Sequence, residues 1–418
     1  MRPLKTQMEP TSRRGHIQRG AWGLVSQSAS TAGNLATAIF VASTSSAAAF
    51  GAWSVGYAVA LGVLTIVRAV CSTPLILDDA AGESRLIPER GAISSSWWLG
   101  SIAGVAVAAS SLLTHGHLSQ ILLVFGISLP ILMVQDSLRY LLFARRTPAP
   151  AAAMDVIWLV VTIAGFLVLS ALHLTGGATA TLVWTLGALV SCGYAAARGV
   201  IPSLLPSHAL AYLRQQRWVS SRLLADSILN SISTQALPVV LALSGGLASA
   251  GALRAGQTLF GFIGVVVAGL TPVMTAEAVR DLRSGGSAWR LVLVWSLLLA
   301  FLGGLFGSIL YTIPDSVGIL ALGASWAGAI ALLLPLTVQA VLRGPLTGVP
   351  IVFRARLQLN RALGLRLMTA VPSLALPVVG AIGWQASGAA WGIAASALIS
   401  SIMALIWLRV SEGREVSQ

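Results

Sequence analysis

Charge is scarce in this chain. Only 9% of its 418 residues are charged and 56% are hydrophobic, whereas an average soluble protein is about 25% charged. Cysteine occurs twice, as Cys71 and Cys192 near the ends of apolar runs, which provides neither a disulfide framework nor a metal-ligand spacing. We interpret both as small apolar residues. The composition excludes an ordinary soluble protein and predicts an all-α, polytopic membrane protein.

Motifs that carry chemistry are also missing. No glycine-rich loop precedes a Lys-Ser or Lys-Thr pair, which argues against an ATPase. The five histidines fall in tails or loops, and His115 and His117 on one turn are interpreted as a solvated loop rather than a zinc site. No acidic residue lies in the middle of an apolar run. We therefore expect no catalytic residue, no bound metal and no cofactor, and hence a protein that is not an enzyme.

The net charge of +13 is unusual for a chain with so few charges. The basic residues are spread over short segments between apolar runs instead of forming one basic surface, which argues against a nucleic-acid partner. The lipid bilayer is the expected partner.

Apolar runs of about 20 residues recur along the chain, and each is long enough to cross ~30 Å of hydrocarbon. The turns between them predict twelve transmembrane helices, at residues 21–41, 47–70, 91–113, 118–141, 152–172, 178–198, 223–243, 248–274, 289–311, 316–341, 363–382 and 387–408. With the N-terminus inside, none of the outer loops contains Lys or Arg. This predicts a bacterial cytoplasmic membrane protein with both termini in the cytoplasm. The amino-acid composition, rich in Arg, Ala and Gly with a single lysine, is typical of a high-GC bacterial genome.

The second half of the chain repeats the first. Residues 50–57 (FGAWSVGY) align with residues 250–257 (GALRAGQ preceded by Ala250) at a constant offset of 200, and residues 135–139 (QDSLR) align with residues 339–343 (QAVLR) at an offset of 204. Six spans per half predict a parallel repeat of two six-helix lobes about an axis along the membrane normal. The expected division is a cytoplasmic tail, an N-lobe, a cytoplasmic linker, a C-lobe and a second tail, at 1–20, 21–198, 199–222, 223–408 and 409–418. A basic start before an apolar run also fits a cleaved signal peptide, but the repeat requires the first span and disfavours cleavage.

Arg254 is the only basic residue expected well inside a span, about 10 Å deep, where the first half has Ser54. An arginine at such depth costs ~2.5–3.5 kcal/mol and should face water or a partner. Gln257 and Thr258 share its helix face. We predict an anion site in a central cavity; the alternative is that Arg254 reaches outward or binds backbone carbonyls of a neighbouring helix.

Polar stripes follow the first and seventh spans at helical spacing. They are expected to face inward, because lipid-facing positions would be apolar. The stripes include Ser30 and Asn34 in the first span, and Asn230 and Thr234 in the seventh. They predict either cavity lining or hydrogen bonds that join helices.

Three acidic residues lie at the expected inner ends of spans: Asp136, Asp155 and Asp226. Asp136 can reach Arg139 one helical turn away. The two interpretations are a belt of ion pairs at the inner face, or a gate of Asp136, Arg139 and Asp226 that holds the cytoplasmic side shut in one state.

Two segments carry a resemblance to known proteins. Residues 135–146 (QDSLRYLLFARR) with residues 153–158 (AMDVIW) resemble the junction of spans 4 and 5 in bacterial polysaccharide flippases of the O-antigen and teichoic-acid type, and residues 251–257 are similar to the start of their span 8. These proteins are members of the multidrug/oligosaccharidyl-lipid/polysaccharide (MOP) exporter superfamily, whose twelve-span topology matches nearly the whole chain.

The resemblance implies a MATE-like fold, in which a V-shaped pair of lobes opens alternately to each side. Its expected cargo is an oligosaccharide or polysaccharide precursor linked to undecaprenyl diphosphate, with Arg254 supplying charge for the diphosphate. Other glycan-assembly membrane proteins are further candidate partners, and the coupling ion stays open. Drug-exporting relatives handle cations with buried carboxylates, which this chain lacks in mid-span.

Competing interpretations remain. A small-molecule antiporter of the same fold would need a coupling carboxylate in the cavity, for which Asp226 is the candidate. A glycan polymerase or ligase would be expected to carry a sizeable outer loop with catalytic residues, and the predicted outer loops are short. The sequence also allows a scaffold protein.

Overall fold

The computed structural model describes residues 13–78, 86–145, 147–200, 202–356 and 358–416. These residues form helices and no strand. In chain order the elements are α1 (Arg13–Thr44), α2 (Ala47–Val67), a π-helical turn η1 (Arg68–Ser72), α3 (Thr73–Asp78), α4 (Leu86–Ser110), η2 (Ser111–Leu113), α5 (Gly116–Ala144), α6 (Pro148–Ala171), α7 (Gly177–Ala197), α8 (Pro206–Gln215), α9 (Arg217–Ser244), α10 (Gly246–Arg283), α11 (Ala288–Thr312), α12 (Asp315–Leu322), η3 (Gly323–Ser325), α13 (Trp326–Ile330), α14 (Leu333–Leu342), α15 (Gly344–Ala355) and α16 (Leu359–Val416).

Eight helical segments among the described residues are long and apolar enough to cross a membrane: 47–75, 89–113, 116–144, 148–171, 177–197, 288–312, 333–355 and 360–412. The last is 53 residues long and contains two helices joined at a kink, where Trp384 and Gln385 leave the helical conformation. The kink falls in the turn predicted at residues 383–386. The first, seventh and eighth predicted spans correspond to α1, α9 and α10.

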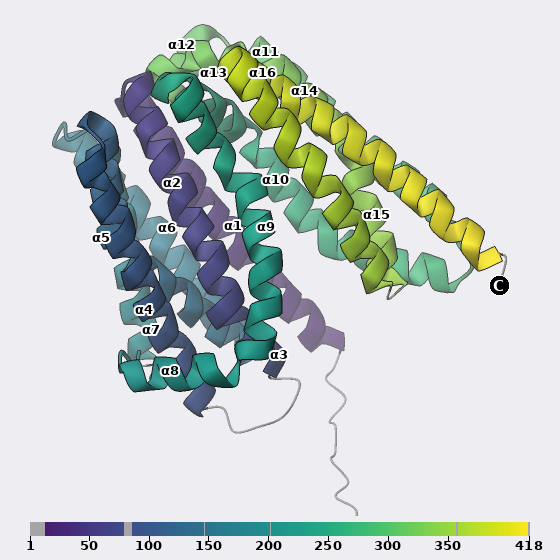
Figure 1. Ribbon diagram of the computed structural model, residues 1–418, viewed down its shortest axis with the longest axis horizontal. Helices are drawn as coiled ribbons and strands as arrows, with labels where there is room; N and C mark the ends of the chain where they lie inside the picture. Colours follow the sequence, from purple (N-terminus) through teal and green to yellow (C-terminus); the bar gives the residue numbers. More distant parts are fainter. Residues whose placement is uncertain (1–12, 79–85, 146, 201, 357, 417–418) are drawn as a thin grey trace, which may run out of the picture.

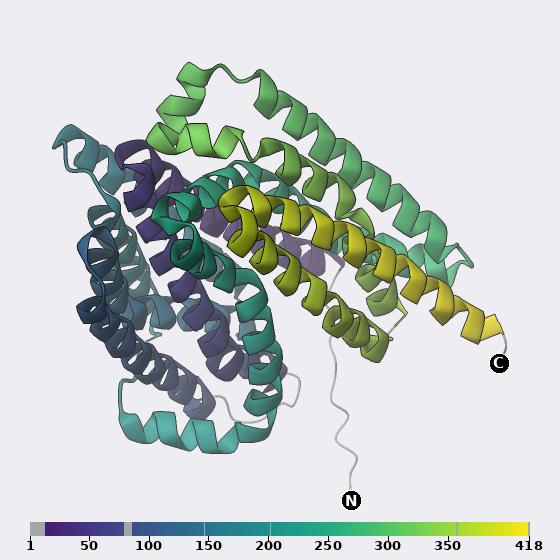
Figure 2. The same cartoon turned by 45° about the horizontal axis from the view of Figure 1, so that its top comes forward.

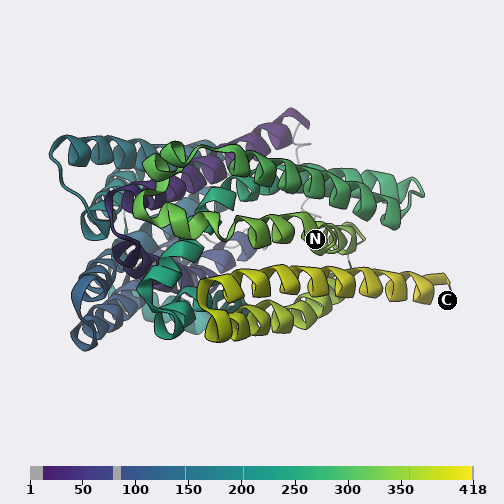
Figure 3. The same cartoon turned by 90° about the horizontal axis from the view of Figure 1, so that it is seen from above.

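The helices form two groups that meet at one end and diverge at the other (Figures 1 and 2). Helices α1 to α7 pack mainly among themselves, while α11 and α14 to α16 form a second group. Helices α9 and α10 contact both groups, because each packs on α2 as well as on α16. Helix α8, within the predicted linker, packs on α4. Seen from above, the C-terminal helices lie to one side of the N-terminal group (Figure 3).

Helices α2 and α10 cross at their N-terminal ends through two glycines. A Cβ atom on Gly51 would lie 1.6 Å from the carbonyl oxygen of Leu247, and one on Gly251 would lie 2.5 Å from that of Ala47. The two contacts are reciprocal, since Ala47 and Leu247 are also 200 positions apart. Only glycine permits this approach of two backbones. The offset found in the sequence is therefore also the offset of a local two-fold contact.

The prediction of one continuous span at 316–341 is wrong. Residues 315–330 form two short helices and a 3-10 turn, and a long apolar segment begins only at Leu333 and runs to Ala355. Hydropathy alone placed a span end near Arg343, because the charge and the following Gly344-Pro345 resemble a terminus. The expectation that Arg254 is the only arginine inside a span is wrong for the same reason, since Arg343 lies in the middle of this segment.

Candidate functional site

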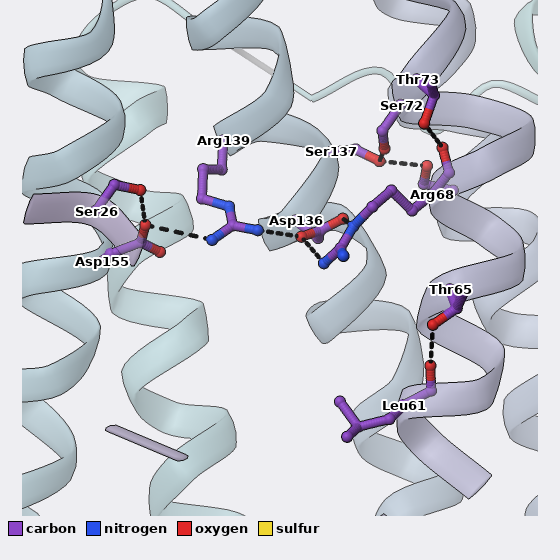
Figure 4. A network of polar contacts seen from close by, with 11 residues as sticks. Ser26, Leu61, Thr65, Arg68, Ser72, Thr73, Asp136, Ser137, Arg139 and Asp155 are labelled. Atoms are coloured by element: carbon purple, nitrogen blue, oxygen red, sulfur yellow. Dashed lines mark hydrogen bonds and ion pairs between the residues drawn. The ribbon is translucent and has the colours of Figure 1, made fainter. Parts of the chain in front are cut away.

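A chain of ion pairs crosses the N-terminal group of helices (Figure 4). Asp136 on α5 accepts two hydrogen bonds from Arg68, at 2.9 Å from Nε and 2.8 Å from Nη2, and a third at 2.8 Å from Arg139. Arg139 continues to Asp155 on α6 at 3.4 Å, and Ser26 on α1 donates to the same carboxylate. Four helical elements are thereby joined through two carboxylates.

Local structure explains how these residues meet. Asp136 and Arg139 are three positions apart on α5 and so share a face. Arg68 begins the π-helical turn at the end of α2. Tyr140 lies under both arginines, with its ring centroid 5.2 Å from Cζ of Arg68 and 5.6 Å from Cζ of Arg139. A buried charge this well paired stabilises a structure only while every member is present.

The pair of Asp136 and Arg139 was expected from the sequence, and the structure contains it. All described partners of the two residues lie in the N-terminal group of helices. A gate would join the two groups, so this arrangement favours the belt interpretation. Asp226, the third gate candidate, has a side chain outside the described residues, as does Asn230.

A second ion pair, Glu89 with Arg145, joins α4 to the end of α5 at 2.6 Å and 2.9 Å. The hydrogen bonds from Arg145 to Glu89 raise the pKa of this arginine above its usual value. The Arg145 side chain is one-third exposed, while that of Glu89 is 10% exposed.

Arg254 lies at the contact between the two groups. Its Cζ atom is 4.6 Å from the ring centroid of Tyr57 on α2, a cation–π contact. Tyr57 ends an aromatic series with Trp53 and Phe50, and it also contacts Trp184. The Nε atom of Arg254 is buried and has no hydrogen-bond partner among the described residues. Arg254 thus neither reaches outward to a loop nor pairs with a described carboxylate.

The other cavity candidates separate into two sets. Gln257 lines a cavity of about 280 Å³ within the C-terminal half, whereas Thr258 is buried and donates to the backbone oxygen of Arg254. Ser30 and Asn34 are partly buried on α1, and Thr234 is exposed on α9. Of the predicted residues whose side chains the structure describes, Gln257 lines this cavity.

Several residues of this region were not predicted as site residues. Arg68 joins Asp136 from 68 positions away, and no local pattern indicates this pairing. Tyr57 aligns with Gln257 in the repeat, but this alignment did not predict its contact with Arg254. Arg343 also lines the cavity. The sequence pattern that could have indicated Arg343 is Gln-x-x-x-Arg, which occurs at residues 135–139 and again at residues 339–343. The second copy lacks the aspartate of the first. Among the described residues no group of His, Cys, Asp and Glu could hold a metal ion.

No protein-family model matches the sequence, and no curated protein matches it in a sequence search. Solved structures of the same fold are found. The inward-facing conformation of a multidrug resistance MATE family transporter of the MOP superfamily has a TM-score of 0.72 at 15% identity, covering 93% of this chain and 96% of that one. The outward-facing conformation of such a transporter has a TM-score of 0.58 at 15% identity, covering 97% and 96%.

A third neighbour is a MOP superfamily transporter from Pyrococcus furiosus, described as having a binding pocket of reversed polarity that suggests a different function. It has a TM-score of 0.51 at 16% identity, covering 95% of each chain. The chain therefore has the fold of MATE transporters of the MOP superfamily.

Proposed function

We propose that this protein is a membrane transporter that moves an anionic, lipid-linked oligosaccharide or polysaccharide precursor across the bacterial cytoplasmic membrane by alternating access. The lipid carrier is a polyprenyl diphosphate such as undecaprenyl diphosphate. The main support for this proposal is which charged side chains are paired. In the N-terminal half the carboxylates of Asp136 and Asp155 are held by arginines, while Arg254 at the junction has no carboxylate partner among the described residues.

This imbalance favours an anionic cargo. A guanidinium in a low-dielectric site attracts phosphate more strongly than it would in water and can bind two oxygens at once. A site for a cationic drug would need a free carboxylate instead. Ser30, Asn34, Asn230, Thr234, Gln257 and Thr258 are proposed to line the path of the polar head group.

The proposal includes twelve transmembrane helices in two six-helix lobes with cytoplasmic termini. The reciprocal contact of Gly51 and Gly251 supports a parallel repeat, since both halves contribute the same surface to it. The diverging ends of the helix groups lie on the side of the C-terminus (Figure 1). The higher TM-score with the inward-facing neighbour supports a state open to the cytoplasm.

A small-molecule antiporter is the second candidate, and the multidrug transporters among the structural neighbours favour it. It requires a titrating carboxylate in the transport path. Asp226 is the candidate in this chain. Loss of drug efflux in an Asp226→Asn variant, with glycan export intact, would support this function over the first.

Arg254→Ala is expected to lower glycan export by about ten- to a hundredfold, the effect of losing one charge-assisted hydrogen bond. The measurement is surface glycan in the native host, together with lipid-linked intermediates on the inner leaflet, at matched protein levels. Arg254→Lys should retain part of the export because it keeps the charge, and Arg409→Ala, an exposed arginine near the end of α16, serves as control. Normal export by Arg254→Ala would contradict an anion site at this position.

A further inference from the structure

Arg343 lies deep within the C-terminal half. The apolar segment from Leu333 to Ala355 places it at the eleventh of 23 positions. The packing on α11 gives the same depth: a Cβ on Gly303 would lie 3.0 Å from the backbone of Ala340, and one on Gly344 would lie 2.5 Å from Cα of Ser296. Arg343 is therefore level with the middle of α11, which spans Ala288–Thr312.

Comparison of the two halves shows that Arg343 lacks the carboxylate partners of its counterpart in the N-terminal half. Its counterpart Arg139 binds both Asp136 and Asp155. At the position that corresponds to Asp136 the second half has Ala340. No hydrogen bond or ion pair joins the Arg343 side chain to another residue within the part of the chain that the structure describes, although the side chain is accessible. At this repeat position, Arg139 is paired with carboxylates in the N-terminal half, whereas Arg343 has no described carboxylate partner in the C-terminal half.

Arg343 lines the cavity of about 280 Å³ enclosed by α10, α11, α14, α15 and α16. Two amide side chains, Gln257 and Gln339, line it as well, together with Thr347. Neither amide has a described hydrogen-bond partner, so both can bind a ligand. Gly261 and Gly264 line the α10 side of the cavity, and a Cβ atom added at Gly264 would meet nothing within 4 Å.

An unpaired arginine in an apolar segment opposes insertion and folding, so it is expected to face water or a ligand in a cavity. A guanidinium with two amide donors matches the oxygens of a phosphate group. The cavity is close to the lower limit of ~300 Å³ for ligand pockets, which suits a head group and not a whole amphiphile. The remaining wall is apolar, which strengthens the attraction by lowering the local dielectric constant.

We infer that Arg343, Gln257 and Gln339 form an anion subsite for a phosphate group of the transported lipid. This inference rests on the proposed function and adds to it a second position for the head group, inside the C-terminal half. Arg254, at the junction between the groups, and Arg343, inside the C-terminal half, would then act at different positions along the transport path.

The test is the binding of farnesyl diphosphate, a short and soluble probe, to the purified full-length protein in detergent by calorimetry. Arg343→Ala should weaken binding at least about tenfold, and Arg343→Lys should recover part of it. Gly264→Leu, which fills the cavity from the opposite wall and keeps the charge, should weaken binding as well. Arg409→Ala is the matched control and should bind as the unmodified protein does.

Further probes identify the source of the phosphate. Farnesol should bind equally to all variants, since it lacks the diphosphate. Inorganic pyrophosphate and phosphatidylglycerol should compete poorly; if either competes as well as farnesyl diphosphate, the site is for a free anion or for bulk lipid, and the inference is overturned. A melting temperature of Arg343→Ala at or above that of the unmodified protein is expected, because the variant removes an unpaired charge, and a large decrease would indicate a structural role.

The outcome is separable from that of the proposed function. If Arg254→Ala blocks glycan export while Arg343→Ala and Gly264→Leu bind farnesyl diphosphate normally, the subsite is absent and the function stands. If the unmodified protein does not bind the diphosphate, the subsite is overturned whatever the export assay gives. If Arg343→Ala and Gly264→Leu both lose binding of farnesyl diphosphate while Arg254→Ala exports glycan normally, the subsite is supported and the role of Arg254 is contradicted.

Discussion

Replacing Asp136 by asparagine is expected to destabilise the folded protein by about 3–5 kcal/mol, the cost of removing one partner from a buried ion pair. The aspartate is contacted by two arginines, and its own side chain is 6% exposed. Without its charge, Arg68 and Arg139 face each other with only Asp155 to compensate. The measurement is the melting temperature of the protein in detergent, which should fall by several degrees.

Glu89→Gln is the matched control for this experiment. It also removes a buried carboxylate that binds an arginine of the N-terminal half. It leaves one arginine, Arg145, whose side chain is one-third exposed, whereas Asp136→Asn also leaves Arg139, whose side chain is only 10% exposed. Its cost should be smaller than that of Asp136→Asn, about 1–3 kcal/mol, because water can hydrate the one arginine that it leaves without a carboxylate. In the Asp136→Asn background, Arg139→Gln should restore part of the stability by removing one excess charge. An Asp136→Asn variant that melts with the unmodified protein would show that the ion-pair chain does not hold these helices together.

Replacing Gly51 by alanine is expected to have an effect of similar size, about 3 kcal/mol or more, because the added methyl group overlaps a backbone atom and not a side chain that can move. Its Cβ atom would lie 1.6 Å from the carbonyl oxygen of Leu247 and 2.5 Å from the carbon atom of the same group. Helices α2 and α10 would have to separate where the two helix groups meet. The amount of monodisperse protein and its melting temperature in detergent measure the effect.

Gly193→Ala is the control for Gly51→Ala, since a Cβ atom at Gly193 on α7 would meet nothing within 4 Å. Alanine is there a better helix former than glycine, so stability should stay the same or rise. Gly251→Ala tests the reciprocity of the contact and should resemble Gly51→Ala, as its Cβ atom would lie 2.5 Å from the carbonyl oxygen of Ala47. Unchanged stability of both variants would refute the close crossing of α2 and α10.

Much of the fold follows from local patterns. The length of apolar runs is set by the thickness of the bilayer, which is why most predicted spans lie within observed helices. The offset of 200 residues aligns Gly51 with Gly251 in the sequence, and the structure brings these two glycines together. The ion pair of Asp136 and Arg139 followed from helical spacing alone.

The remainder depended on tertiary structure. Arg68 reaches Asp136 through a π-helical turn that no hydropathy pattern indicates. The sequence predicts a span end near Arg343 because a charge followed by Gly344 resembles a helix terminus. In the structure α14 ends there, but the apolar segment continues through α15 to Ala355. Arg254 was expected to face a cavity, and its contact with Tyr57 required knowing that α10 packs on α2.

The central claim is that the cargo is an anionic lipid-linked glycan. The most direct measurement reconstitutes the purified protein in liposomes and follows a fluorescent oligosaccharide linked to a polyprenyl diphosphate from one leaflet to the other. The account predicts translocation by the unmodified protein and its loss in Arg254→Ala. No movement of this lipid, together with efflux of an organic cation driven by a proton or sodium gradient, would contradict the account and assign the protein to the antiporters.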